Sequence, residues 1–215
     1  MHDTAMEIGR EFFSVYGAHG FDRILDVGSL NVNGSLRSVA PGNADYVGVD
    51  LCTGRDVDIV LEDSRKLPFL DESFDCVVST SCFEHDSMFW ITFLECVRVL
   101  RKGGYLYINA PSNGVVHRFS LDCWRFYPDS GLALAQWGRK SGMEVYLKES
   151  FTAKRKGDMW NDFVAVFGKG VGVGSSYLFE RFPGSMNIRR EEYPEMINPE
   201  EDTEDIKKIK ELMRG

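Results

Sequence analysis

Apolar and polar positions alternate along the chain with two periods, one typical of strands and the other of helices. Residues 5–16 open the chain with apolar side chains at helical spacing, and helix-like segments follow at residues 35–40, 86–100 and 129–141. Short apolar runs typical of strands cover residues 23–27, 45–50, 58–61, 74–79, 105–110, 143–150 and 162–167. Strands that alternate with helices form a mostly parallel sheet with helices on both faces. We therefore expect an α/β fold with a doubly wound, mostly parallel sheet of seven strands.

The chain changes character after residue 168, where a glycine-rich run leads into a highly charged tail. This change predicts three parts: an N-terminal helix in residues 1–20, one globular domain in residues 21–168, and a linker with a charged tail in residues 169–215. We expect the tail to lie outside the core as a solvated segment. A stripe of Ile206, Ile209 and Met213 leaves open a short helix that docks on a neighbour or forms a homodimer with a second copy.

The composition narrows the classes of partner and compartment. The 215 residues carry a formal net charge of −8, which argues against nucleic acid and against an anionic membrane as partners. No run approaches the roughly 18 apolar residues of a membrane helix, and the first residues lack the pattern of a signal peptide. The five cysteines include no C-x-x-C pair, which predicts reduced thiols and no metal cluster. We expect a soluble cytoplasmic protein.

The stretch "ILDVGSLNVNGS", residues 24–35, reads as a first strand that runs into a ligand-binding loop. In open parallel sheets ligands bind beyond the carboxyl ends of the strands, where this loop would lie. Gly28 and Gly34 allow the backbone to turn tightly and to approach a ligand, and Asn33 and Ser35 can cap a following helix. An ordinary turn remains the alternative interpretation of this stretch alone.

The second strand ends in Asp50, which follows Gly28 by 22 residues. A carboxylate at this place can accept two hydrogen bonds from a ribose diol, so it favours a nucleoside cofactor. Four residues, Ser29 to Val32, take the space where a dinucleotide fold needs a close glycine turn for its pyrophosphate. The missing glycine therefore disfavours a nicotinamide cofactor and favours S-adenosylmethionine, which has no phosphate.

Three downstream motifs carry a family resemblance. Residues 63–75, "DSRKLPFLDESFD", match a D-x-x-x-LPF-x-D-x-S-F-D signature, residues 79–85 read "STSCFEH", and residues 98–111 read "RVLRKGGYLYINAP". In this order and spacing, residues 20–168 resemble the class I S-adenosylmethionine-dependent methyltransferases, most closely a small-molecule branch. The resemblance implies a Rossmann-like fold and S-adenosylmethionine as the cofactor.

The resemblance also implies places for individual residues around the cofactor. Asp26 and Gly28, with Ser29, Asn33 and Gly34, would lie at the methionine end. Asp50, with Leu51 beside it, would bind the ribose, and Asp63, with Ser64, would accept from the adenine amino group. Ser79 and Thr80 would close the pocket near the sulfonium. Asp75 starts the fourth strand, at the end away from the ligand, so we expect only a structural role for it.

Methyl transfer to a hydroxyl is an in-line displacement that a base can assist. His85 follows the fourth strand and is a candidate base, although it can equally pack or cap the next helix. His117 is a second candidate in the long loop of residues 111–131, and Asp122 is a third. Long loops in compact domains are often functional, so we expect this loop to form the acceptor wall with Trp124, Arg125 and Tyr127.

The leading hypothesis is an S-adenosylmethionine-dependent methyltransferase that acts on a hydroxyl of a small molecule. The D-x-W-R-F-x-P run of residues 122–128 resembles that of methyltransferases of glycan and surface polysaccharide assembly, which favours a sugar acceptor. No N-P-P-Y-type segment follows the fourth strand, so a nucleic-acid base is not expected as the acceptor. The alternatives are a catalytically silent, methyltransferase-like binding or regulatory subunit and a nicotinamide-dependent oxidoreductase.

Overall fold

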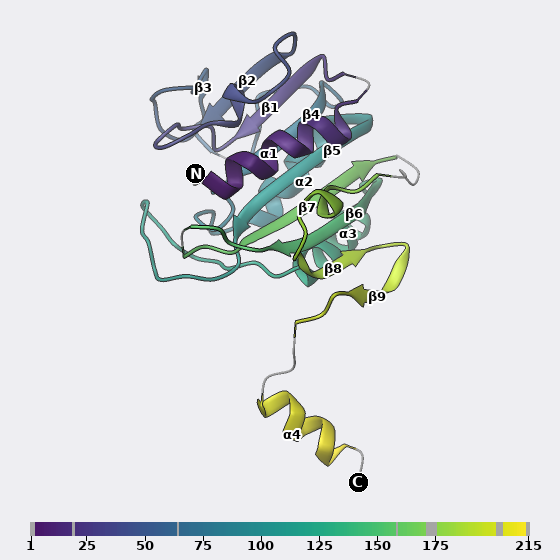
Figure 1. Cartoon of the computed structure of the whole chain (residues 1–215). Coiled ribbons are helices and arrows are strands. Elements are labelled where there is room, and N and C mark those ends of the chain that lie inside the picture. The colour runs from purple at the N-terminus through teal and green to yellow at the C-terminus, as the bar shows by residue number, and fades with distance from the viewer. Residues whose placement is uncertain are drawn as a thin grey trace.

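The computed structural model of the chain has one nine-stranded sheet in the order β3-β2-β1-β4-β5-β7-β6-β8-β9 (Figure 1). It describes residues 3–18, 20–63, 65–157, 159–170, 176–200 and 204–213. The strands are β1 (Arg23–Val27), β2 (Asp45–Asp50), β3 (Ile59–Val60), β4 (Phe74–Thr80), β5 (Leu100–Pro111), β6 (Val145–Ala153), β7 (Asp162–Lys169), β8 (Met186–Arg190) and β9 (Tyr193–Ile197). The helices are α1 (Asp3–Tyr16), α2 (Phe89–Val99), α3 (Asp129–Lys140) and α4 (Glu204–Leu212), and the 3-10 helices are η1 (Leu36–Ser38) and η2 (Leu178–Arg181).

The sheet is parallel in its first half and antiparallel in its second. Strands β3, β2, β1, β4 and β5 pair in parallel, whereas β7, β6, β8 and β9 pair antiparallel with their neighbours. All seven predicted strands are present, so the α/β sheet is confirmed. The expected count of seven is wrong, because β8 and β9 extend the sheet beyond β6.

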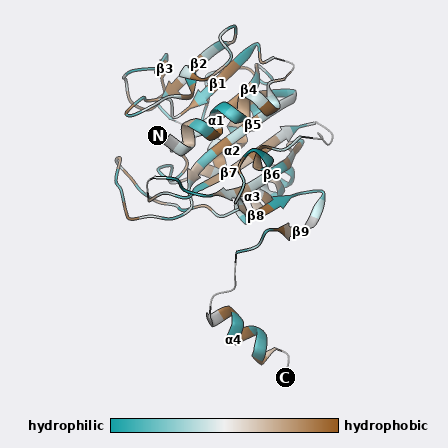
Figure 2. Ribbon diagram, in the orientation of Figure 1, coloured by the Kyte–Doolittle hydropathy of each residue, from teal (hydrophilic) through white to brown (hydrophobic). Residues whose placement is uncertain are grey.

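Two apolar layers cover the two faces of the sheet. One layer packs Ile8 and Phe12 of α1 against Ile24, Val78 and strands further along the sheet. The other layer packs α2 and α3 against the opposite face of the same strands. Figure 2 shows the hydrophobic residues concentrated on these strands and helices, whereas α4 is mostly hydrophilic. Helices on both faces are therefore confirmed.

The helix expected at residues 35–40 is wrong in kind. Only a short 3-10 helix forms there, at Leu36–Ser38, and the Ser35 side chain caps it by accepting from the Arg37 N–H at 3.2 Å. The segment is short because a tightly hydrogen-bonded turn ends at Ala40 and Pro41 follows. Proline lacks a backbone N–H and disfavours a helical residue before it.

The segment after residue 175 is partly integrated into the core, contrary to the expectation of an external tail. Leu178 of η2 and Ile188 of β8 are buried against the α1 face of the sheet. The charged residues around them concealed these few apolar anchors in the sequence. The side chains described in α4 are exposed, and this helix lies beyond the sheet in Figure 1. The proposed division at residues 20 and 168 stays a prediction.

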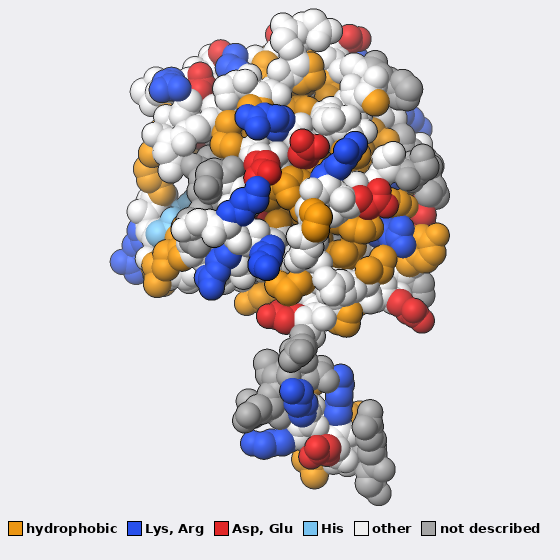
Figure 3. All heavy atoms as spheres, in the orientation of Figure 1, with side chains coloured by type: hydrophobic (Ala, Val, Ile, Leu, Met, Phe, Trp, Pro, Cys, Tyr) orange, Lys and Arg blue, Asp and Glu red, His pale blue; other side chains and the backbone are white. Residues whose placement is uncertain are grey.

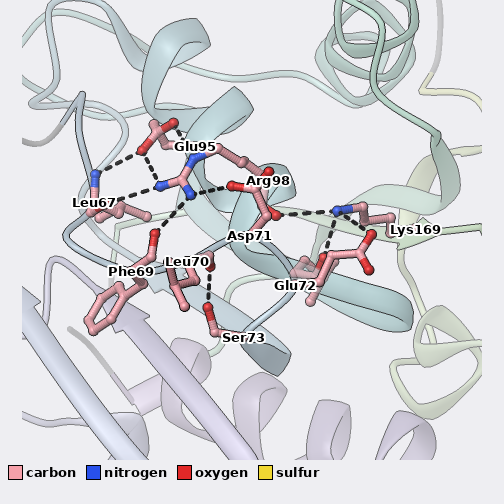
Figure 4. A network of polar contacts seen from close by, with 10 residues as sticks. Leu67, Phe69, Leu70, Asp71, Glu72, Ser73, Glu95, Arg98 and Lys169 are labelled. Atoms are coloured by element: carbon pink, nitrogen blue, oxygen red, sulfur yellow. Dashed lines mark hydrogen bonds and ion pairs between the residues drawn. The ribbon is translucent and has the colours of Figure 1, made fainter.

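A polar network around Arg98 of α2 fixes the loop that carries the Leu67-Pro68-Phe69 signature (Figure 4). The guanidinium donates to the carbonyls of Leu67 at 3.0 Å and Phe69 at 2.8 Å, and to the carboxylates of Asp71 and Glu95 at 2.7 Å. Glu95 in turn accepts from the Leu67 N–H at 2.8 Å. The signature and the R-V-L motif therefore meet in space, and they hold the loop that begins at Asp63.

The surface has mixed charge. Acidic and basic side chains are interspersed over the face drawn in Figure 3. Within the residues that the structure describes, no helix combines the length and apolar character needed to cross a membrane.

Candidate functional site

A cleft of about 550 Å³ opens at the carboxyl ends of β1, β2 and β4. It is lined by eleven of the predicted site residues: Asp26, Gly28, Ser29, Asn33, Gly34, Asp50, Leu51, Asp63, Thr80, His85 and His117. Five others do not line it: Ser79, Asp122, Trp124, Arg125 and Tyr127. Ser64 lies outside the described residues.

In the loop after β1, the backbone at Gly28 passes close to the side chain of Cys82, as its glycine predicts. Gly28 has φ +85, and a Cβ there would lie 2.5 Å from the Cβ of Cys82, so a larger residue would collide. The side-chain oxygen of Asn31 accepts from the Gly34 N–H at 2.9 Å across the same loop. The Asn31 amide also donates to Asp56 at 2.6 Å. The loop is therefore ordered by side-chain bonds.

Asp50 ends β2 at the rim of the cleft, half-buried. Its two carboxylate oxygens accept from the Leu30 N–H at 3.1 Å and from the Cys52 N–H at 2.9 Å. These bonds orient the carboxylate, and each oxygen keeps a further lone pair. The group is thus positioned to accept from a diol in the cleft.

Asp26 is a buried acid in the cleft wall. The Tyr46 hydroxyl donates to it at 2.8 Å. Burial outweighs this bond and the nearby Arg37 charge and raises the pKa of Asp26 to about 7. A positively charged ligand group beside it would favour the ionised form.

Asp63 lies at the open end of the cleft. Its carboxylate accepts from the side chain and the backbone N–H of Arg65, at 2.5 and 2.9 Å. Hydrogen bonds from the Arg65 side chain are the main reason why the pKa of Asp63 is lowered. The carboxylate is exposed and retains lone pairs for a further donor.

Ser79 and Thr80, adjacent in β4, have different surroundings. The buried Ser79 hydroxyl donates to the Val27 carbonyl at 2.8 Å, so it ties β4 to β1 and lies behind the cleft wall. The hydroxyls of Thr80 and Ser29 are buried in the wall and have no hydrogen-bond partner among the described residues. Unsatisfied hydroxyls in a cleft wall fit a polar ligand.

Glu84, His85 and His117 gather at one end of the cleft. Glu84 is 1% exposed, and burial raises its pKa to about 7. Its Oε1 lies 3.7 Å from Nε2 of His85, and the rings of His85 and His117 meet edge to face with centroids 5.1 Å apart. The ligand-type atoms of these three residues lie within 4.8 Å of one another. The sequence suggested the two histidines, whereas Glu84 was noticed only as part of a motif.

Asp122 supports His117 from behind the cleft. It accepts from the His117 backbone N–H at 2.7 Å and from Arg125 at 2.6 and 2.9 Å. The hydrogen bonds from Arg125 hold the pKa of Asp122 well below its usual range. A carboxylate in two such bonds is a poor proton acceptor, so the prediction of Asp122 as a base is corrected to a positioning role.

The predicted acceptor wall is formed by other residues of the same region. Trp124 turns away to donate to the Asp86 carbonyl at 2.9 Å, and Tyr127 is exposed. Phe119, Leu121 and Trp160 line the cleft instead. The first two lie in the expected loop, but Trp160 comes from the turn before β7, which no motif indicated.

Asp75 has the structural role expected of it. Its carboxylate accepts from the Arg23 N–H at 2.8 Å and from Arg101 at 2.7 Å, at the end of the sheet away from the cleft.

Comparisons with known proteins give relatives in sequence and in fold. Residues 25–108, less than half of the chain, match a family model described as a methyltransferase domain. A phthiotriol/phenolphthiotriol dimycocerosates methyltransferase of Mycobacterium tuberculosis is 37% identical over 134 residues, which cover 56% of this chain and 46% of that protein. The chain spans less than half the length of the curated relatives it matches.

Solved structures match the class I methyltransferase fold over most of the chain. A 1,6-didemethyltoxoflavin-N1-methyltransferase of Burkholderia thailandensis, solved with S-adenosylhomocysteine, has a TM-score of 0.58 at 16% identity and covers 77% of this chain and 78% of that chain. The YcgJ protein of Bacillus subtilis has a TM-score of 0.55 at 11% identity and covers 80% of this chain and 100% of that chain. At this identity the likeness concerns the fold alone.

Proposed function

We propose that the chain is an S-adenosylmethionine-dependent methyltransferase that methylates a hydroxyl of a small molecule. The carrying observation is Asp50, whose carboxylate is oriented by two backbone bonds at the carboxyl end of β2, inside the cleft. The Burkholderia relative in fold binds S-adenosylhomocysteine, which supports the same class of cofactor here.

The residues of the cleft fit this cofactor. Asp50 can accept from both ribose hydroxyls, and Asp63 from the adenine amino group. Asp26 offers a carboxylate to the amino group of the methionine moiety. The partnerless hydroxyls of Ser29 and Thr80 can bond to polar groups of the same ligand. When bound, S-adenosylmethionine supplies an electrophilic methyl group on sulfur.

The chain contributes position and proton handling to the transfer. The Gly28 loop and Cys82 form one wall of the cleft, and Phe119, Leu121 and Trp160 give its other end an apolar lining against which an acceptor can be positioned. The group of Glu84, His85 and His117 faces the remaining space and can act on a hydroxyl placed there. This division puts the cofactor at β1 and β2 and the acceptor beside β4.

The acceptor class follows from this second half of the cleft. Histidine, glutamate and aromatic surfaces suit a hydroxylated molecule with an apolar part. The mycobacterial relative is named for a triol, which supports a hydroxyl as the methylated group. A sugar remains the acceptor favoured by the residue 122–128 run, and a hydroxylated lipid is the alternative that the relative favours.

Transfer of a labelled methyl group tests the proposal. The full chain is incubated with labelled S-adenosylmethionine and panels of sugars, nucleotide sugars and long-chain diols. We expect label in one hydroxylated class. The variant H85A should lower the rate at least about 100-fold and leave S-adenosylhomocysteine affinity unchanged. Cofactor binding without transfer to any panel would contradict catalysis and favour a methyltransferase-like binding subunit.

A further inference from the structure

We propose that Glu84, His85 and His117 bind one divalent transition-metal ion at the acceptor end of the cleft. Their ligand-type atoms lie within 4.8 Å of one another. Ligand atoms about 2.1 Å from one zinc ion lie about 3.4 Å apart in a tetrahedral arrangement. The 3.7 Å between Glu84 Oε1 and His85 Nε2 is close to that spacing. The sequence alone predicted no metal site, because only Glu84 and His85 are adjacent, whereas His117 follows His85 by 32 positions.

Glu84 is the first reason to place a cation here. The residue is 1% exposed and lines the cleft, and its Oε2 has no hydrogen-bond partner within the described part of the chain. A buried carboxylate oxygen without a donor is costly unless a proton or a cation satisfies it. The unsatisfied oxygen therefore points to a ligand.

The tautomer of His85 is the second reason. Its Nδ1 lies 2.5 Å from the Leu121 carbonyl oxygen, which can only accept, so Nδ1 carries the proton. In the neutral imidazole Nε2 then has a free lone pair, and it faces the Glu84 carboxylate, with which it can share a cation. Metal-binding histidines commonly donate their other N–H to a backbone carbonyl in this way.

His117 has a carboxylate next to one ring nitrogen, which is another common arrangement for metal-binding histidines. Its Nδ1 lies 3.5 Å from the buried Asp122 carboxylate, which leaves Nε2 as the nitrogen for a cation. Nη2 of Arg125 lies 3.3 Å from the same Nδ1. When Nδ1 carries a proton, Arg125 keeps its bonds to Asp122 and to the Val115 carbonyl, so this contact is dispensable.

Two imidazoles and one carboxylate select the class of ion. Imidazole suits zinc and its first-row neighbours, whereas magnesium and calcium prefer an all-oxygen set. Three protein ligands leave a coordination position open in the manner of catalytic zinc sites. If the proposed function holds, the acceptor oxygen takes that position. This role rests on the proposed function, whereas metal binding itself does not. His85 then binds the ion and is not the base.

Calorimetric titration of the metal-stripped full chain with zinc chloride tests the site, and cobalt absorption gives a second readout that reports nitrogen and oxygen ligands. We expect one ion per chain. Both E84Q and H117A should weaken binding at least about 100-fold, since E84Q removes the negative charge of one ligand and H117A removes another ligand. E195Q, which removes the same charge from an exposed position in β9, should not. H117A changes a partly exposed loop residue, so it keeps the test valid even if E84Q folds poorly.

Titration of the same samples with S-adenosylhomocysteine separates this inference from the proposed function. Cofactor binding with no zinc binding, or with zinc binding that E84Q and H117A leave intact, would overturn the metal site alone. Zinc binding that depends on Glu84 and His117, without cofactor binding, would support the site and contradict the proposed function.

Discussion

Two carboxylates of the cleft, Asp26 and Asp50, differ in burial and in their hydrogen-bond donors. Asp50 is half-buried and held by two backbone N–H groups, whereas Asp26 is buried with one tyrosine donor. On the proposed function, Asp50 would bind the cofactor through its fixed geometry, and Asp26 would bind it through its charge, which depends on pH.

Cofactor affinity should rise with pH because of Asp26. Burial raises its pKa to about 7, so the carboxyl is mostly neutral at pH 6 and mostly ionised at pH 8. Only the ionised form attracts the ammonium of the methionine moiety. We expect the Kd of S-adenosylhomocysteine to fall about tenfold from pH 6 to pH 8. Calorimetry on D26N should show weaker binding with a flat pH dependence; an unchanged slope in D26N would assign the effect elsewhere.

Gly28 should tolerate no side chain. Alanine there is strained at φ +85 and collides with Cys82. We expect G28A to lose about 1 to 3 kcal/mol of unfolding free energy and at least about tenfold in cofactor affinity. G142A is the matched control, because Gly142 has φ +84 with no atom within 4 Å of the added Cβ. Equal loss of cofactor affinity in both variants would show that crowding against Cys82 is irrelevant.

The sequence was enough to predict that residues at strand ends lie in the cleft, but it did not show which residues from other parts of the chain contact them. Asp50 and the glycine loop are local signals, so their place in the cleft followed from the pattern. Glu84 and Trp160 acquire their roles only through the fold, which buries one and brings the other across from a distant turn. Trp124 and Tyr127 were misplaced because an aromatic run does not reveal which side chains turn inward.

At the scale of elements, polar contacts of Arg98 hold the loop that carries the Leu67-Pro68-Phe69 motif. Arg98 joins α2 to the loop that leads from Asp63 to β4, as Figure 4 shows. Strand positions were predicted well because apolar runs are local. The helix expected at residues 35–40 is only the short η1, because the chain turns at Ala40. The apolar spacing of the sequence does not show this turn.

Loss of the Arg98 network should loosen this loop. We expect R98A to reduce the unfolding free energy by about 1.5 to 3 kcal/mol, since partly buried bonds to a charged group are lost. K66A removes one charge from an exposed position of the same loop and should change it by less than about 0.5 kcal/mol. Urea denaturation measures both, and equal stabilities would show that the network contributes nothing.

At the scale of the whole molecule, the sheet extends through β8 and β9 while α4 lies beyond it (Figure 1). The apolar anchors Leu178 and Ile188 attach this extension to the domain. Composition averaged over the tail hid them, which is why the sequence predicted a tail wholly outside the core.

Removal of residues 201–215 should leave the domain intact. The cleft lies at the other half of the sheet, so we expect unchanged cofactor affinity and unfolding free energy. Ile209 and Leu212 of α4 are 55% and 82% exposed, which fits both the solvated tail that we expect and the homodimer that the sequence leaves open. Light scattering separates the two: equal mass after truncation is the result expected for a solvated tail, and halved mass would show the homodimer.

We propose that the cleft beside β1, β2 and β4 binds S-adenosylmethionine through Asp50. Calorimetric titration with S-adenosylhomocysteine tests it most directly, with D50A beside D45A, which changes an exposed acid at the opposite end of β2. We predict one ligand per chain with micromolar Kd, at least about 100-fold weaker binding in D50A because two hydrogen bonds from the ribose to a charged group are lost, and unchanged binding in D45A. Absence of binding, or equal affinity in D50A, would contradict the account.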